Sequence, residues 1–176
     1  WYEYWKTKRL NWYHSIGIRA EHLRLRAHDP EELSHYSSGT TDIEVHFPWG
    51  WGELEGIANR GNYDLTQHAD HSGQKLTYFD QDRNEHIVPH VIEPAAGVDR
   101  IFLTLLLDAY DEEEVGEDTR TVLRLSPKIA PVNVAVLPLS RNEKLTPTAR
   151  SVMDVLRSQF KAQYDDAQSI GRRYRR

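Results

Sequence analysis

The stretch of sequence that most restricts the fold runs from Glu93 to Tyr110 and reads EPAAGVDRIFLTLLLDAY. Its second half is apolar almost all the way round, which predicts a helix in the core of a domain. Gly97, Asp99 and Arg100 nevertheless stand in its first turns, although glycine inside a helix costs about 1 kcal/mol relative to alanine. At helical spacing the polar residues form one stripe, which comprises Gly97, Arg100, Thr104 and Asp108. The side expected to be buried comprises Ile101, Phe102, Leu103, Leu105, Leu106 and Leu107.

The residues before this helix are expected to form an α+β domain with a mostly antiparallel sheet. Apolar and polar residues alternate in short segments, which is typical of strands with one solvated face. These segments are residues 22–27, 41–48, 52–58, 75–79 and 86–93. A polar turn joins the last two, which predicts a hairpin. Helical spacing and end signals predict helices at residues 2–16, 29–36 and 62–73.

The end of the chain differs in kind from the rest. Residues 119–127 alternate like the earlier strands, but residues 132–137, VNVAVL, are continuously apolar, which is typical of a parallel sheet buried on both faces. A helix is expected to follow at residues 146–164. We therefore predict two domains. The α+β domain occupies residues 1–128, and the start of an α/β domain, truncated after one strand and one helix, occupies residues 129–176.

Composition excludes several classes of protein. The formal net charge is −5 and cysteine is absent, so neither a global attraction for nucleic acid nor a thiolate metal site is expected. No apolar run approaches the roughly 18 residues that a transmembrane helix needs, and we expect a cytoplasmic protein without membrane contact. The acidic run at residues 108–118 predicts an exposed loop or linker. The terminal GRRYRR, residues 171–176, suits phosphate and base contacts, or it is a solvated turn.

The first candidate site lies where a strand gives way to the helix. Glu93 precedes Pro94, which forces an extended residue before it, so the carboxylate is expected at the lip of a sheet. Gly97 would let a ligand lie against the helix, with Arg100 one turn away for stacking or phosphate contact. The alternative is a close-packed glycine beside a surface pair of Asp99 and Arg100.

Two further sets of polar residues are weaker candidates. Glu53 and Glu55 are expected on one face of a strand, with Arg60 beyond its end. They would either hold a divalent metal together with nucleotide phosphates or form a solvated strand face. His68 and His71 are three residues apart on a helix, but zinc takes more than two protein ligands, so a solvated helix is favoured.

Three segments together resemble consecutive parts of a known family, the dimeric bacterial type of glycyl-tRNA synthetase among the class II aminoacyl-tRNA synthetases. The segments are GELEGIANRGNYDLTQHADHSG, VPHVIEPAAGVDRIFLTLLLDAY and LSPKIAPVNVAVLPL. The run EPAAGVDR is similar to the third class II motif in its glycyl form, and the last segment is similar to the entry to the anticodon-binding domain. The resemblance covers almost the whole chain and implies an antiparallel class II catalytic sheet followed by an α/β anticodon-binding domain.

The resemblance also implies a reaction. Glycine would attack the α-phosphate of ATP, accompanied by Mg, and the resulting glycyl-adenylate would pass its glycyl group to tRNA. The full-length parent is expected to be a cytoplasmic homodimer. The first motif, which builds the dimer interface, and the second, whose arginine binds the α-phosphate, have no counterpart here. RNE at residues 83–85 echoes the second motif only by coincidence, since it precedes the third. We therefore expect an internal segment that cannot form the adenylate alone.

Residue by residue, the resemblance assigns Glu93 to the ammonium group of glycine. The implied glycine site comprises Glu93, Pro94, Ala95, Ala96, Gly97 and Arg60. The implied ATP site comprises Glu53, Leu54, Gly97, Val98, Asp99 and Arg100. Glu53 would act through Mg, and Arg60 would lie near the glycine carboxylate or the phosphates. Ala95 stands where the family often has serine, so one hydrogen bond to the substrate is lost.

Two other functions are compatible with parts of the sequence. A synthetase-like accessory protein would bind nucleic acid without aminoacylation, and a free-standing structural domain would carry GRRYRR as a tail. A pure binding module has no use for an amino-acid pocket, so Glu53, Glu93 and Arg100 argue against the first. The second leaves Gly97 and Arg100 unexplained.

Overall fold

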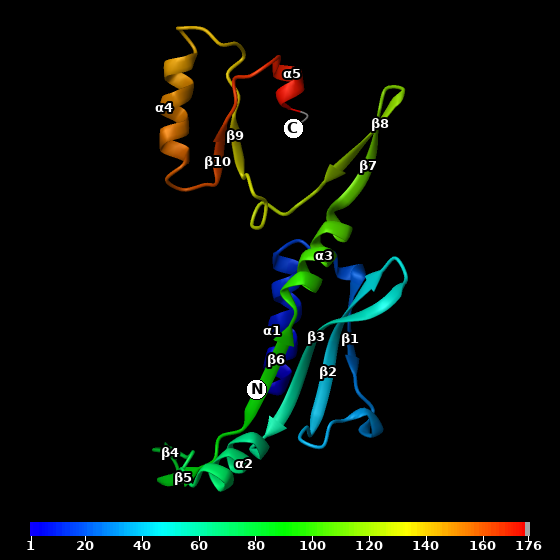
Figure 1. Cartoon of the computed structure of the whole chain (residues 1–176), viewed down its shortest axis with the longest axis vertical. Helices are drawn as coiled ribbons and strands as arrows, with labels where there is room; N and C mark the ends of the chain where they lie inside the picture. Colours follow the sequence, from blue (N-terminus) through cyan, green and yellow to red (C-terminus); the bar gives the residue numbers. More distant parts are fainter. Residues whose placement is uncertain (175–176) are drawn as a thin grey trace. The chain divides into compact units, whose positions relative to one another are not determined.

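The computed structural model describes residues 1–174 and divides into two units, Trp1–Arg124 and Leu125–Arg176 (Figure 1). Unit 1 combines antiparallel sheets with helices, so the predicted α+β class is confirmed. Within residues 1–174, no helix is both long enough and apolar enough to cross a membrane. The assignment of the units to a catalytic and an anticodon-binding domain stays a prediction.

A four-stranded antiparallel sheet forms the centre of unit 1, in the order β1-β2-β3-β6. Its strands are β1 (Leu23–Ala27), β2 (Gly39–Phe47), β3 (Gly50–Gly61) and β6 (Val91–Ala96). The alternating segments of the sequence therefore become strands as expected. The predicted strand at residues 86–93 is divided, because its first part forms a small separate hairpin and its second part joins the main sheet.

Helix α1 (Tyr2–Ser15) covers one face of this sheet (Figure 1). The phenol of Tyr2 bonds Thr41 on β2, and the phenol of Tyr13 bonds Glu55 on β3. Ile43 and Ile57 lie opposite Glu55 and Thr41 in the strand register, so they point toward the same helix. Tyr13, Ile43 and Ile57 are fully buried, and this layer is the core of unit 1.

Smaller elements extend from the sheet. They are the 3-10 turns at Ala20–His22 and Pro30–Glu32, α2 (Tyr63–Ser72), the hairpin of β4 (Tyr78–Asp80) and β5 (Glu85–Ile87), α3 (Val98–Ala109), and the hairpin of β7 (Tyr110–Val115) and β8 (Asp118–Leu123). The acidic run predicted as a loop or linker therefore forms mostly the β7–β8 hairpin. The helix predicted at residues 29–36 shrinks to a single 3-10 turn.

Helix α3 begins later than the sequence predicted. Residues 93–96 continue β6, and Gly97 caps the helix with an extended backbone, φ −87° and ψ 124°. Pro94 fits within β6 because this strand lies at the edge of the four-stranded sheet, where an absent N–H is tolerated. Gly97 therefore lies outside the helix, and the expected cost of a glycine within it does not arise. That cost can no longer be used as evidence that a ligand lies against Gly97.

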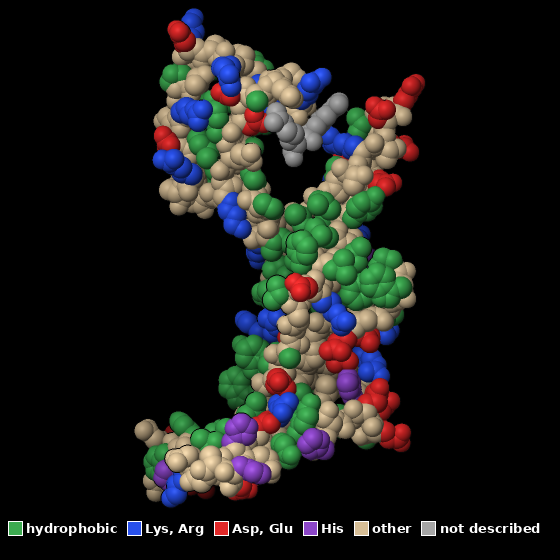
Figure 2. Space-filling model, viewed as in Figure 1, with side chains coloured by type: hydrophobic (Ala, Val, Ile, Leu, Met, Phe, Trp, Pro, Cys, Tyr) green, Lys and Arg blue, Asp and Glu red, His purple; other side chains and the backbone are tan. Residues whose placement is uncertain are grey.

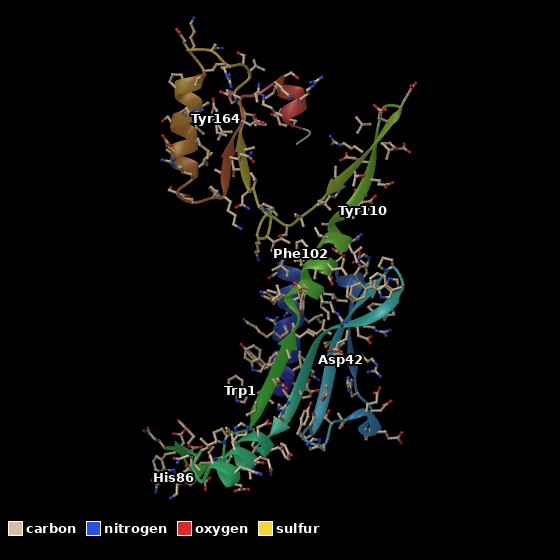
Figure 3. All side chains as sticks on the ribbon, viewed as in Figure 1. Trp1, Asp42, His86, Phe102, Tyr110 and Tyr164 are labelled. Carbon is tan, nitrogen blue, oxygen red and sulfur yellow. The ribbon has the colours of Figure 1, made fainter. Side chains whose placement is uncertain are left out.

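The exposure of α3 also differs from the prediction. Thr104, in the polar stripe, is 1% exposed, whereas Phe102 and Leu103 are 62% and 42% exposed. Phe102 is labelled on α3 in Figure 3. Leu105, Leu106 and Leu107 are only partly buried. Within the described residues, Thr104 of the polar stripe is therefore buried while Gly97 and Arg100 are exposed, and the apolar side is exposed at Phe102 and Leu103 and half-buried elsewhere.

Unit 2 is a βαβ arrangement. Strands β9 (Val134–Val136) and β10 (Ala162–Tyr164) pair in parallel, and α4 (Thr146–Leu156) connects them. The helix predicted at residues 146–164 thus ends at Leu156, and its last residues form a second strand. The prediction of a unit that breaks off after one strand and one helix is therefore wrong, although its parallel pairing is as predicted.

A short helix, α5 (Ile170–Arg173), closes unit 2 and changes the interpretation of the basic terminus. The guanidinium of Arg173 is buried and donates hydrogen bonds to backbone carbonyl groups just beyond the two strands. These carbonyls belong to Pro138, Leu139, Asp165 and Gln168. Arg173 is therefore a structural residue, unavailable to nucleic acid, while Arg172 and Tyr174 are exposed. The last two residues of GRRYRR lie outside the described residues.

Candidate active site

Two residues of the predicted glycine-binding site, Glu93 and Ala95, lie on the face of the sheet opposite α1. Antiparallel register pairs Ala58 with Glu93 and Gly56 with Ala95, and residues directly opposite each other project from the same face. Glu55 and Ile57, with Ala96 and Pro94 opposite them, point to the α1 face instead, since side chains alternate along a strand. We call the surface that carries Arg60, Glu93 and Ala95 the open face.

Arg60 and Glu93 form an ion pair on the open face. Arg60 Nη1 donates to Glu93 Oε2 over 2.7 Å, while its Nε and Nη2 donate to the two carboxylate oxygens of Asp64, each over 2.7 Å. The guanidinium also lies 3.9 Å from the ring centroid of Tyr36. The hydrogen bonds that Arg60 donates to Asp64 first and Glu93 second raise the pKa of Arg60, and Arg60 lowers the pKa of Asp64. A permanently charged Arg60 therefore fixes the position of the Glu93 carboxylate.

Glu53 approaches the same face from the other end of β3. A Cβ atom added to Gly56 would lie 3.4 Å from Glu53 Oε1 and 3.7 Å from Asp42 Oδ1. The Glu53 and Asp42 carboxylates therefore converge over Gly56, which pairs with Ala95 of the predicted glycine site. Sequence reasoning missed Asp42, because it occupies a polar position of an alternating strand and was taken for part of a solvated face (Figure 3).

The prediction that Glu53 and Glu55 share one face is wrong. The register of β2 and β3 shifts between Ile43 and Glu44, so Glu55 lies opposite Ile43 whereas Glu53 lies opposite Glu44. Such a bulge sends neighbouring side chains to different sides. Glu55 is 1% exposed and accepts two hydrogen bonds from Arg9, over 2.7 and 2.9 Å, and one from Tyr13, over 2.6 Å. Its carboxylate is therefore committed to structure.

Arg100 is anchored to the strand that carries Glu53. Its Nη1 donates to the Glu53 carbonyl over 2.6 Å. Further along the polar stripe, Thr104 donates to the Arg100 carbonyl, and the carboxylate of Asp108 accepts from the backbone N–H and the Nε of Arg19 and contacts the Nδ1 of His22 over 2.5 Å. The stripe predicted as a ligand wall thus also attaches α3 to β3 and to the 3-10 turn before β1.

A cleft of about 400 Å³ lies beside this anchor. It is lined by Phe47, Trp49, Gly52, Glu53, Asp99, Arg100 and Leu103. Three residues of the predicted ATP site, Glu53, Asp99 and Arg100, are thus brought together. Val98 is 79% exposed but does not line the cleft, and Leu54 is 2% exposed, so it offers a ligand almost no surface. Sequence reasoning passed over Phe47 and Trp49, which it assigned to a strand end and a turn.

The structure provides no counterpart for a zinc site. His71 Nδ1 is hydrogen-bonded to the Gln67 carbonyl of its own helix. In the part of the chain that the structure describes, no group of three or more His, Cys, Asp or Glu side chains is arranged to hold a metal ion. The HADH stretch of α2 therefore carries no metal-site argument.

Comparisons with known proteins agree with the sequence resemblance. The whole chain is 55% identical to 38% of the glycine–tRNA ligase of Caldanaerobacter subterraneus subsp. tengcongensis. It is 53% identical to 40% of the enzyme of that name from Streptomyces coelicolor, and 53% identical to 38% of that from Lysinibacillus sphaericus. The chain is homologous to a segment of glycine–tRNA ligases. It spans about two fifths of the length of these relatives. No family model matches the chain.

Homology to glycine–tRNA ligases confirms the predicted resemblance over the full 176 residues. It directs attention to the open face and the adjoining cleft. Arg60, Glu93 and Ala95 of the predicted glycine site lie on that face, and Glu53, Asp99 and Arg100 of the predicted ATP site line that cleft. The individual roles of these residues stay predictions.

Proposed function

We propose that the protein to which this segment corresponds attaches glycine to tRNA through a glycyl-adenylate. Homology at 52–55% identity along the whole chain supports the reaction. The observation that supports the site most directly is that β3 anchors both the predicted glycine site and the predicted ATP site. Arg60 on β3 bonds the Glu93 carboxylate, and the Glu53 carbonyl on β3 bonds the Arg100 guanidinium. Strand β3 therefore positions the Glu93 carboxylate, which would bind the amine of glycine, and the Arg100 guanidinium, which would bind ATP.

The glycine site is built around Glu93. Its side chain is 45% exposed, with one oxygen held by Arg60, so the carboxylate is oriented and still accessible to the ammonium group of glycine. Ala95 follows on the same face of the same strand, whereas Pro94 and Ala96 project from the α1 face. The small side chain of Ala95 suits a substrate that has none. Arg60 acts first as a positioning residue for Glu93, because three of its donor groups are engaged by Glu93 and Asp64.

The ATP site is the cleft beside Arg100. The guanidinium is placed to stack on the base or to contact phosphate, and Asp99 lines the cleft beside it at the start of α3. The Glu53 carboxylate, next to Asp42, offers the oxygen ligands that Mg prefers. Mg enters with the triphosphate of ATP as part of the substrate, with phosphate oxygens supplying most of its coordination.

In this arrangement the glycine carboxylate attacks the α-phosphorus of ATP. A new P–O bond forms, the bond to the leaving pyrophosphate breaks, and the glycyl-adenylate remains in the site. The protein contributes mainly by positioning the two reactants and by balancing charge. The terminal ribose hydroxyl of tRNA then attacks the glycyl carbonyl, and AMP leaves.

The remaining parts of the proposal concern the whole protein. The four-stranded antiparallel sheet is interpreted as part of a class II catalytic sheet, and the βαβ unit supports an α/β anticodon-binding domain. Binding of tRNA, homodimerisation of the parent and a cytoplasmic location follow from this assignment. The accessory-protein alternative is disfavoured, because Arg173 of the basic terminus is occupied by backbone carbonyls.

Glycine-dependent exchange of pyrophosphate into ATP tests the proposal. In the full-length protein, Glu93→Gln should raise the KM for glycine by about tenfold to a hundredfold, since it removes a charged hydrogen-bond acceptor. Glu85→Gln, at an exposed carboxylate of β5, is the matched control and should change nothing. Equal exchange by Glu93→Gln and the wild type would contradict the site. The isolated 176-residue segment should show no measurable exchange, because the arginine expected to bind the α-phosphate is absent.

A further inference from the structure

The guanidinium of Arg60 joins three elements of unit 1 at the predicted glycine site. Arg60 lies near the end of β3, donates to Asp64 of α2 through Nε and Nη2, and donates to Glu93 of β6 through Nη1. Figure 2 shows acidic, basic and hydrophobic side chains meeting beside α2. Because the donors of a guanidinium lie in its plane, these hydrogen bonds leave both faces of the group to be covered by other side chains.

Tyr36 covers one of these faces. Its ring centroid lies 3.9 Å from the central carbon of the Arg60 guanidinium, well within the roughly 6 Å over which a cation and an aromatic ring attract each other. The Arg60 side chain is only 19% exposed, and such attraction strengthens as water is removed. The hydrogen bonds set the direction of the N–H groups, whereas the ring prevents the guanidinium plane from tilting.

The loop that carries Tyr36, residues 33–38, is itself attached to α2 and β3. The ring of His35 packs edge-on against Tyr36, with 5.2 Å between centroids, and against Tyr63 at the start of α2, with 5.3 Å between centroids. His35 Nε2 also lies 3.2 Å from the Tyr63 hydroxyl oxygen. The Ser38 N–H donates to the Asn59 carbonyl of β3 over 2.9 Å. The loop is therefore tied to the two elements that carry Arg60 and its partner on α2.

We propose that Tyr36 is a positioning residue of the glycine site, which holds the Arg60 guanidinium in the orientation that bonds Glu93. This inference rests on the proposed function, to which it adds a residue that acts through Arg60 and not through contact with the substrate. Without the ring, Arg60 keeps its two bonds to Asp64 but can tilt away from Glu93. The Glu93 carboxylate, which is 45% exposed, then turns freely in water and loses its fixed direction toward the ammonium group of glycine.

Glycine-dependent pyrophosphate exchange by the full-length protein tests this inference. Tyr36→Leu keeps an apolar side chain but removes the ring, and it should raise the KM for glycine about threefold to tenfold, within the range for loss of one cation–π interaction. The KM for ATP should not change, because Arg60 takes no part in the cleft beside Arg100. Tyr36→Phe keeps the ring and should behave as the wild type. Tyr78→Leu, at a 60% exposed tyrosine of β4, is the matched control and should change neither KM.

A double-mutant cycle separates positioning from a general loss of structure. Because Tyr36 acts through Glu93, Tyr36→Leu should add little to the rise in KM that Glu93→Gln already causes. An unchanged KM for glycine in Tyr36→Leu, or effects of the two substitutions that multiply in full, would overturn the inference and leave the proposed function standing. If Glu93→Gln itself leaves the KM unchanged, the glycine site fails, and this inference fails with it.

A second series of variants decides the matter if Tyr36→Leu does not fold, as judged by circular dichroism. Phenylalanine with one to three fluorine atoms on the ring then replaces Tyr36, because fluorine withdraws negative charge from the ring face that attracts a cation. The KM for glycine should rise with each added fluorine, while the shape of the side chain hardly changes. A KM that stays constant along the series would overturn the inference.

Discussion

Glu55 and Glu53 lie two residues apart on β3, yet the strand uses them in opposite ways. Glu55 is 1% exposed beneath α1, with both oxygens taken by Arg9 and Tyr13. Glu53 lies beyond a bulge and is exposed beside the cleft. Both carry the same charge, so the difference arises from the partners that tertiary structure supplies. A carboxylate whose acceptors are all filled is structural, and one left accessible is a candidate for a ligand.

The largest effect is expected when the buried Glu55 loses its cationic partner, Arg9. Arg9→Ala should lower the free energy of unfolding by about 3–5 kcal/mol, because it leaves the buried Glu55 carboxylate without its charged partner. Urea unfolding followed by circular dichroism measures this. Arg83→Ala, at a 69% exposed arginine paired with Asp80, is the control and should cost less than about 1 kcal/mol. Similar losses in the two variants would mean that Glu55 is not the buried anchor described here.

The phenol of Tyr13 makes the stability of the face beneath α1 depend on alkaline pH. Burial first, and the hydrogen bond to Glu55 second, raise the pKa of Tyr13 well above its ordinary value of about 10. The folded state therefore keeps a proton that the unfolded chain loses above pH 10, so stability present at lower pH declines as pH rises. The decline should be about 1 kcal/mol per pH unit. Tyr13→Phe should lack this part of the decline between pH 10 and 11, and identical slopes would argue against it.

The smallest stability effect is expected on the open face. Glu93→Gln should change the free energy of unfolding by less than about 0.5 kcal/mol, because Glu93 is 45% exposed and its ion pair with Arg60 is partly solvated. Thermal unfolding of Glu93→Gln and of Glu55→Gln, measured side by side, compares the stability that each carboxylate contributes. A loss as large as that of Glu55→Gln would place Glu93 among the structural carboxylates and remove it from the glycine site.

Much of unit 1 could be predicted from local pattern. Alternating residues located β1, β2 and β3, and the position of Glu93 before Pro94 indicated a carboxylate on a strand near the start of a helix. These features depend on neighbours in sequence, so the pattern contains them.

The features that sequence reasoning missed depend on partners far along the chain. The apolar pattern of α3 predicted which side would be buried, but Arg100 bonds Glu53, and Asp108 bonds Arg19 and His22. These contacts attach the polar stripe to β3 and to the 3-10 turn before β1. The bulge that separates Glu53 from Glu55 is likewise set by pairing with β2. Arg173 was read as a possible nucleic-acid contact because its carbonyl partners are not adjacent to it in sequence.

The most direct measurement of the central claim is a crystal structure of the full-length protein with a non-hydrolysable sulfamoyl analogue of glycyl-adenylate. The account predicts that the glycyl ammonium group lies within hydrogen-bonding distance of the Glu93 carboxylate and that the adenosine lies against Arg100. An analogue bound away from the open face, or in contact with neither side chain, would contradict it.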